Sequence, residues 1–247
     1  MKTIKLQLPQ SWNELSNNQL ERIALLFHTK QPGAEFDIQV FLILMNVHWY
    51  SVFTFIKART ILFQVPISEL RKHYLFIYKE NNRTNFLPSL KIGTTTYYAP
   101  LARLTNLTAD ELATAEDLHY EWRLKKDIEY LYYLVALLYV TSYQPRPAFD
   151  KNNLEFLVKD FKKVPLAKLL AIELTYFGCK NYLVKRFPKV FPKASPNAGK
   201  AKKTSGLGKV ILMMTKDDPS KLKAIKEINA YAFLEQFTED LTPKKKR

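Results

Sequence analysis

Residues 130–140 are the stretch that most constrains the fold, since they include no charged residue and consist of aliphatic and aromatic side chains. On an α-helix these side chains would point to every side, and a helix that is apolar on every side is normally buried. A helix that spans a bilayer needs about 20 apolar residues, and this stretch is roughly half as long. Pro145 and Pro147 then end it, because proline lacks a backbone donor and disfavours helical geometry in the preceding residue. The sequence therefore predicts a buried central helix that other helices surround.

Signals outside this stretch predict a mainly α-helical fold, a multi-helix bundle around the central helix with one small β-hairpin. Ser16 with Gln19 and Thr108 with Glu111 have the spacing of capping boxes, in which side chains satisfy the free amides at a helix start. Two short β-prone pieces around Gly93 predict the hairpin near residues 89–99. The expected organisation is a helical core domain over residues 1–187, a basic flexible linker over 188–208, a C-terminal helical segment over 209–241 and a basic tail over 242–247.

Weaker signals give expectations for individual segments. Residues 3–8 alternate in polarity and predict a short strand, whereas residues 52–63 are rich in β-branched and aromatic side chains and fit either a helix or a strand. Ser68 predicts the start of a helix that continues to about Lys79. Pro165 suits the first position of a helix running towards Gly178, because its missing amide would be unpaired there anyway.

The last predicted helix begins at Pro219 and is the candidate site for binding a protein partner. Its apolar positions are Leu222, Ile225, Ile228, Tyr231, Leu234 and Phe237. A compact amphipathic helix beyond a linker has two interpretations, which both stay open at this point. It can dock on its own core, or it can lie in a groove of another protein.

The net charge of +15 is a local property of the C-terminal third of the chain. Ten basic residues and no acidic residue lie between Glu173 and Asp217, four more basic residues end the chain, and the other 24 are balanced by 23 acidic residues. A basic segment with aromatic neighbours can bind nucleic-acid phosphates, although a solvated linker explains the same composition and the near absence of arginine favours the linker. The candidate polyanion-binding residues are Lys180, Lys185, Arg186, Lys189, Lys193, Lys200, Lys202, Lys203 and Lys209.

No set of residues predicts a reaction, so we expect no catalytic residue, no metal and no cofactor. The four histidines lie in four separate segments, without the partners at ligand spacing that a metal site needs. Cys179 stands in an apolar context, which is typical of a buried and inert thiol. One cysteine cannot form an internal disulfide, and the first residues lack the apolar stretch of a signal peptide. The expected location is therefore the cytoplasm, with no membrane partner.

Several stretches together resemble proteins encoded in the tail-assembly region of phages and prophages of Bacteroides-type hosts, which are similar to phage tail assembly chaperones. The opening residues 8–15, followed by Gln19 and Leu20, are the strongest match. The other matching positions are Tyr97, Tyr98, Ala99, Pro100, Leu101, Leu107, Thr108, Glu111, Ala136, Leu138, Tyr139, Arg146, Phe149, Asp150, Ile228, Asn229, Ala230, Tyr231, Phe233 and Leu234. This sequence departs from the family at Ala99, where glycine is common, and in its long lysine-rich linker.

The resemblance implies a non-enzymatic protein of the bacterial host cytoplasm that binds the tape-measure protein while the tail is built. It also implies that the protein is absent from the finished particle. Two other functions stay open as alternatives. One is a nucleic-acid-binding protein that uses residues 180–209, and the other is a structural tail or connector component.

Overall fold

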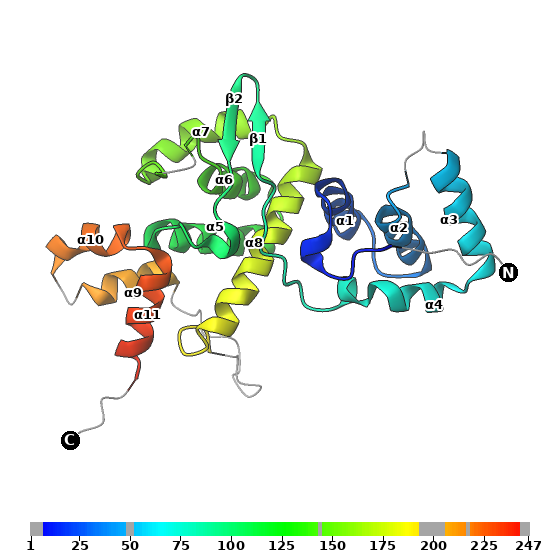
Figure 1. Cartoon of the computed structure of the whole chain (residues 1–247). Coiled ribbons are helices and arrows are strands. Elements are labelled where there is room, and N and C mark those ends of the chain that lie inside the picture. Colours follow the sequence, from blue (N-terminus) through cyan, green and yellow to red (C-terminus); the bar gives the residue numbers. More distant parts are fainter. Residues whose placement is uncertain (1–6, 48–51, 143–144, 193–205, 216–217, 243–247) are drawn as a thin grey trace. The chain divides into compact units, whose positions relative to one another are not determined.

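The structure is a computed structural model that describes residues 7–47, 52–142, 145–192, 206–215 and 218–242. Within these ranges the chain is mainly helical and carries one two-stranded antiparallel sheet, so the predicted fold class is confirmed (Figure 1). The chain forms two compact units. Unit 1 combines Met1–Arg83 with Pro165–Gly178, and unit 2 combines Thr84–Val164 with Cys179–Arg247. Composition alone indicated one helical domain over residues 1–187, because it does not reveal which distant segments pack together.

Unit 1 is built from α1 (Asn17–Thr29), α2 (Ala34–Leu44), α3 (Val52–Gln64), α4 (Ile67–Arg71) and the first part of α8 (Leu166–Arg186), with 3-10 turns at Trp12–Glu14 and Lys72–Tyr78. The capping box that starts α1 is confirmed, since the Gln19 amide donates to Ser16 Oγ at 3.3 Å and the Ser16 amide donates to Gln19 Oε1 at 2.9 Å. Residues 52–63, which the sequence left between helix and strand, are helical. Of the strand predicted at residues 3–8, residues 3–6 lie outside the described residues, and Gln7 and Leu8 are not part of a strand.

Aromatic rings and one buried aspartate hold α1, α2 and the segment after α4 together. The Trp12 ring lies 6.2 Å from Phe27 and 5.8 Å from Phe76, measured between centroids. Tyr78 donates a hydrogen bond to the carboxylate of Asp37. The helix predicted from Ser68 to Lys79 is interrupted at Tyr74, whose backbone is not helical. The Tyr74 hydroxyl donates a hydrogen bond to the backbone carbonyl of Asp37 at 3.2 Å.

Helix α8 passes very close to the backbone at Arg83. A Cβ atom at Gly178 would lie 2.1 Å from the Arg83 carbonyl oxygen and 2.8 Å from its amide nitrogen, so the position has room for hydrogen alone. Glycine therefore serves packing here and does not end the helix, which continues to Arg186, beyond the predicted end. Nη1 of Arg83 donates to the carbonyls of Trp12 at 2.7 Å and Leu15 at 3.3 Å, which ties this segment to the start of the chain.

Unit 2 contains β1 (Ser89–Ile92), β2 (Thr95–Tyr98), α5 (Ala109–Lys125), α6 (Glu129–Leu138), α7 (Leu154–Phe161), the end of α8, α9 (Leu207–Met214), α10 (Leu222–Glu227) and α11 (Ala230–Asp240), with 3-10 turns at Ala102–Leu104, Lys151–Asn153 and Pro219–Lys221. The hairpin is confirmed, and its register pairs Ser89 with Tyr98. Gly93 stands in its turn with a φ of 60°, a conformation that costs glycine little.

Helix α6 is the buried helix that the sequence predicted. Leu131, Leu134 and Leu138 have no exposed surface, and α6 packs between α5 and α7 (Figure 1). It ends earlier than Pro145 because the chain becomes extended at Tyr139. Val140 then pairs with the edge of the hairpin, where the Tyr98 amide donates to its carbonyl at 2.7 Å.

The last predicted helix is divided into α10 and α11. Ile228 is extended, and its carbonyl accepts a hydrogen bond of 2.8 Å from the amide of Ala109 at the start of α5. The Ala230 amide donates to the Leu107 carbonyl, also at 2.8 Å. Asn229 caps α11 by accepting from the Tyr231 amide. The helix breaks because its backbone groups at this point bind residues 107–109 instead of one another.

Candidate functional site

The six apolar residues proposed for partner binding on the last helix cover the core of unit 2. Leu234 is fully buried, and Leu222, Ile225, Ile228, Tyr231 and Phe237 are half-buried. Helices α10 and α11 both pack against α5. Of the two interpretations left open by the sequence, docking on the chain's own core therefore describes this segment.

Tyr231 shows how closely α11 is tied to unit 2. Its hydroxyl donates to the Arg103 carbonyl at 2.7 Å, and its ring makes an edge contact with Phe187 at 5.9 Å. Burial, followed by the nearby Tyr182 and Cys179, raises the pKa of Tyr231 from 10.0 to about 12.

This pKa shift predicts a loss of stability in alkali. The Tyr231 hydroxyl ionises near pH 10 in the unfolded chain, whereas it stays neutral in the folded chain up to a pH of about 12. The contribution of the neutral hydroxyl to the unfolding free energy is therefore complete below pH 10 and is lost as the pH rises to about 12. We expect Tyr231→Phe to lose about 1 kcal/mol at pH 8 with the hydrogen bond, and to show a shallower fall in unfolding free energy above pH 10. Urea unfolding at a series of pH values measures both effects. A variant with the same alkaline slope as the wild type would contradict the assignment.

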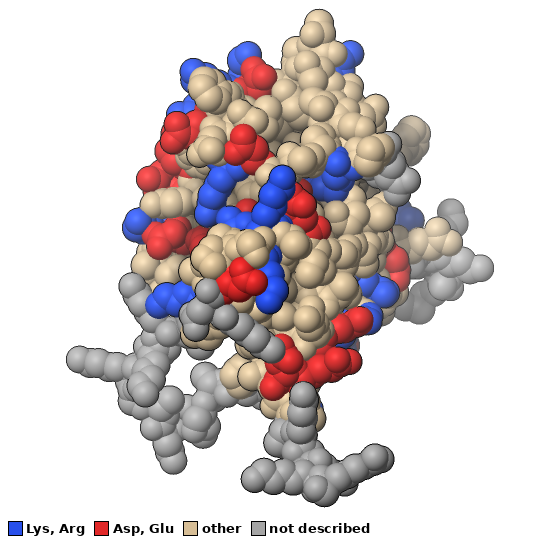
Figure 2. Space-filling view, turned by 90° about the vertical axis from the view of Figure 1, so that its left-hand side faces the viewer, with Lys and Arg blue, Asp and Glu red and all other residues tan. Residues whose placement is uncertain are grey.

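The described basic residues of the candidate polyanion site are largely engaged within unit 2. Lys180 forms an ion pair with Glu116, and Arg186 pairs with Glu235 at 3.1 Å. Lys189 Nζ donates to Thr242 Oγ1 at 2.8 Å. Figure 2 shows basic and acidic side chains interspersed over the face that it draws.

The remaining members of that candidate set divide into two groups. Lys185 and Lys209 are exposed, on α8 and α9. Lys193, Lys200, Lys202 and Lys203 lie outside the described residues. The part of the predicted 188–208 linker between residues 193 and 205, and the end of the predicted basic tail, lie outside them too. The described residues therefore do not bring the nine basic residues together as one site.

The potential metal ligands among the described residues are dispersed. No group of three or more histidine, cysteine, aspartate or glutamate side chains in these ranges is placed to hold a metal ion. Cys179 is fully buried, as its apolar context predicted, and its thiol lies 3.7 Å from the Thr84 carbonyl oxygen. His119 is buried and His28 and His73 are exposed, whereas His48 lies outside the described residues. None of the described helices combines the length and the apolar character needed to cross a bilayer.

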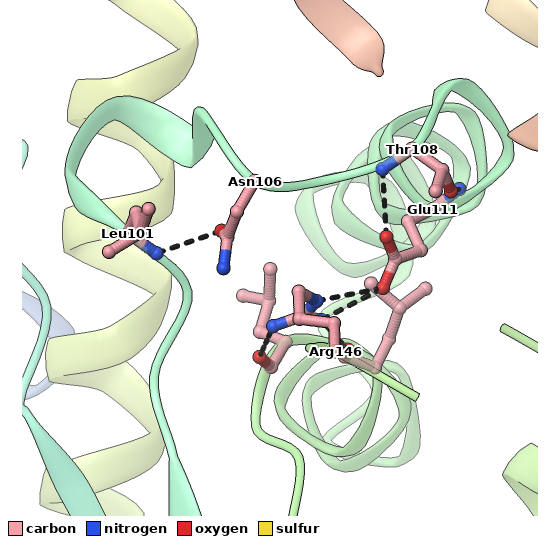
Figure 3. A network of polar contacts seen from close by, with 7 residues as sticks. Leu101, Asn106, Thr108, Glu111 and Arg146 are labelled. Carbon is pink, nitrogen blue, oxygen red and sulfur yellow. Dashed lines mark hydrogen bonds and ion pairs between the residues drawn. The ribbon is translucent and has the colours of Figure 1, made fainter. Parts of the chain in front are cut away.

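A buried polar network joins the start of α5 to the end of α6 (Figure 3). One carboxylate oxygen of Glu111 accepts from the Thr108 amide at 2.8 Å, which completes the predicted capping box, and the other accepts from Arg146 Nη2 at 2.8 Å. The side chains of this ion pair are only 4% and 7% exposed. Arg146 also donates to the carbonyls of Leu137 and Leu138, each at 3.2 Å. The pair therefore ties two helix ends together.

Asn106, which is also labelled in Figure 3, lies in the loop before α5. Its side-chain oxygen accepts from the Leu101 amide at 2.9 Å, which fixes the loop before α5. Its Nδ2 atom is buried and has no hydrogen-bond partner among the described residues. All the hydrogen bonds of this network join residues of unit 2, so we infer that the network stabilises the fold of unit 2.

Among the described helices, α3 carries the largest set of exposed large apolar side chains, which the sequence had not singled out. Phe53 is 90% exposed and Phe63 is 78% exposed, and Val52, Phe55 and Ile56 are each more than half exposed. At 100° per residue these five side chains fall on one broad side of the helix. The opposite side carries Ala58 and Ile61, which are buried in unit 1. We call the exposed set, Val52, Phe53, Phe55, Ile56 and Phe63, the α3 face.

The α3 face is also distinct in its charge. Residues 52–64 include Lys57 and Arg59 and no acidic residue. The Arg59 guanidinium lies over the Phe63 ring at 5.5 Å from its centroid, so a positive charge sits within the apolar surface. Figure 1 draws α3 at the margin of unit 1. An exposed apolar surface edged by polar groups marks a binding site more often than isolated apolar residues do.

Comparison of the chain with protein-family models, with curated proteins and with solved structures finds no match. The α3 face is a set of five apolar side chains that are open to solvent on one described helix.

Proposed function

We propose that this protein is a non-enzymatic phage tail assembly protein, a chaperone that covers an apolar segment of the tape-measure protein while the tail is built. The single observation that supports binding of this kind is the α3 face, where five large apolar side chains are open to solvent on one helix. The link to a phage tail comes from the resemblance of the sequence to tail assembly chaperones.

A chaperone of this type needs an apolar surface that is exposed in the free protein and covered in the complex. Burying apolar area releases about 25 cal/mol for each Å², so five large side chains provide a substantial driving force for binding. Their solvent-facing positions also mean that they contribute little to the stability of the free chain. A partner can therefore cover these side chains without unfolding unit 1.

Co-purification with the partner tests this proposal. The protein is co-expressed with a phage tape-measure protein, and the complex is captured through that partner. We expect Phe53→Ser to reduce the captured chain by about tenfold, because removing a large exposed aromatic anchor typically costs 1–2 kcal/mol or more in binding.

A matched control is available on unit 2. Phe156 on α7 is 71% exposed, so Phe156→Ser makes the same chemical change on an exposed aromatic residue of a different helix. We expect this variant to be captured as efficiently as the wild type. Failure of the wild-type chain to co-purify would contradict the proposal, and so would equal loss in both variants. Finding the protein in purified particles would favour a structural tail component instead.

A further inference from the structure

We infer that the occupant of the α3 face is an amphipathic helix of another protein whose apolar stripe is edged by aspartate or glutamate. The inference rests on the proposed function and adds the chemistry of the bound segment. It follows from the length of α3, from the spacing of its exposed side chains and from the sign of the charge beside them.

The exposed side chains of α3 suit a helix as the bound element. Helix α3 has 13 residues, which corresponds to roughly 20 Å at 1.5 Å per residue. Val52, Ile56 and Phe63 are spaced by four and seven residues, so they form a row along the axis, with Phe53 and Phe55 on either side of it. A row flanked by two further rings offers grooves into which the side chains of a second helix can pack.

The charge of α3 selects the edge residues of that partner. Arg59 lies over Phe63 within the apolar surface, one residue from the middle of α3, and the exposed Lys57 lies one residue to the other side of the middle. A helix that covers the face brings its own edge residues beside this guanidinium, with little water between them. Carboxylates then form charge-assisted hydrogen bonds, whereas lysine or arginine at the same positions is repelled.

A second copy of this chain is a poor occupant by the same reasoning. In a two-fold antiparallel pair, a residue near the middle of a helix lies opposite its own counterpart. Arg59 is one residue from the middle of Val52–Gln64, so self-association through α3 places two guanidinium groups against each other. Like charges held together in a desolvated interface oppose that dimer.

An anionic membrane surface is also a poor occupant. Helices that lie on membranes carry their cations on the polar face, while the apolar face enters the acyl region. On α3 the Arg59 side chain shares the apolar side with Phe63, so inserting that side would carry the charge inwards. A protein helix with acidic edges accommodates both groups at once.

Two synthetic peptides and the full-length chain provide the test. Both peptides are amphipathic helices with the same leucine stripe, and one has glutamate at the edge positions where the other has lysine. We expect fluorescence anisotropy to show at least about tenfold tighter binding of the glutamate peptide at about 0.05 M salt, with a smaller difference at about 0.5 M. Arg59→Glu is expected to remove or reverse this preference.

Lys159→Glu is the matched control, because the Lys159 ammonium lies over the exposed Phe156 ring on α7 at 5.6 Å, as Arg59 lies over Phe63 on α3. We expect this variant to keep the preference of the wild type. Equal binding of the two peptides, or an unchanged preference in Arg59→Glu, would overturn the inference. Concentration-dependent dimers lost in Phe53→Ser would overturn it in favour of a second copy. Binding to phosphatidylserine vesicles through α3 would overturn it in favour of a membrane.

These results are distinguishable from those of the co-purification experiment. If the glutamate peptide binds and the tape-measure protein does not, the inference about acidic-edged helices stands and the tail function fails. If the tape-measure protein is captured through Phe53 and the peptides bind equally, the tail function stands and the charge selection fails.

Discussion

Replacing Arg146 by alanine is expected to destabilise unit 2 by about 3–5 kcal/mol, the usual result of removing one partner from a buried ion pair. The change leaves the Glu111 carboxylate enclosed without its counter-charge and removes two donors from the carbonyls at the end of α6. Urea-induced unfolding followed by circular dichroism measures the loss. An effect below about 1 kcal/mol would indicate that the pair is open to water.

Two further variants separate the charge from the packing at this site. Glu111→Gln combined with Arg146→Met replaces the ion pair by neutral side chains, and glutamine still suits the capping box with Thr108. We expect the double variant to recover a large part of the lost stability. Lys162→Ala is the control for an exposed pair, since Lys162 and Glu129 are 49% and 45% exposed. We expect this variant to keep nearly all of the wild-type stability.

Gly178→Ala is expected to destabilise unit 1 by about 3 kcal/mol or more, although glycine to alanine within a helix normally gains about 1 kcal/mol. The added methyl group would lie 2.1 Å from the backbone carbonyl oxygen of Arg83. That oxygen belongs to the main chain and cannot rotate away, so either α8 or the Arg83 segment must move. The midpoint of urea unfolding measures the effect.

Gly208→Ala provides the opposite expectation on the same chain. Gly208 lies in the first turn of α9, and a Cβ atom there would meet no other atom within 4 Å. We expect a gain of about 0.5–1 kcal/mol from the higher helix propensity of alanine. If the two variants changed stability in the same direction and to a similar extent, the close approach of α8 to Arg83 would be refuted.

Much of the local structure could be predicted because it depends on neighbours in the sequence. The capping boxes at Ser16 and Thr108, the hairpin around Gly93 and the burial of α6 each follow from residues a few positions apart. The helix boundaries that were predicted incorrectly are set by residues far away in the sequence. Gly178 was expected near a helix end, yet it is required by the backbone of Arg83, and the break at Asn229 is caused by residues 107–109.

The candidate site was missed for a related reason. Residues 130–140 are apolar on all sides, which predicts burial, whereas residues 52–63 are rich in apolar side chains and gave only an open choice between helix and strand. In α6 the prediction is correct, whereas α3 buries Ala58 and Ile61 and exposes Phe53 and Phe63. The sequence did contain a signal, because Lys57 and Arg59 interrupt the apolar run of α3 and no charge interrupts that of α6. Whether a helix has a partner within its own chain is decided by the tertiary structure.

The two hydrogen bonds between residues 107–109 and residues 228–230 have a consequence for the order in which unit 2 forms during translation. The start of α5 is synthesised more than a hundred residues before the segment that pairs with it. A nascent chain therefore leaves the ribosome with this end of α5 incomplete, and it closes only when Ala230 has emerged from the exit tunnel. Contacts this distant in the sequence slow folding, so the start of α5 depends on residues that are synthesised near the end of unit 2.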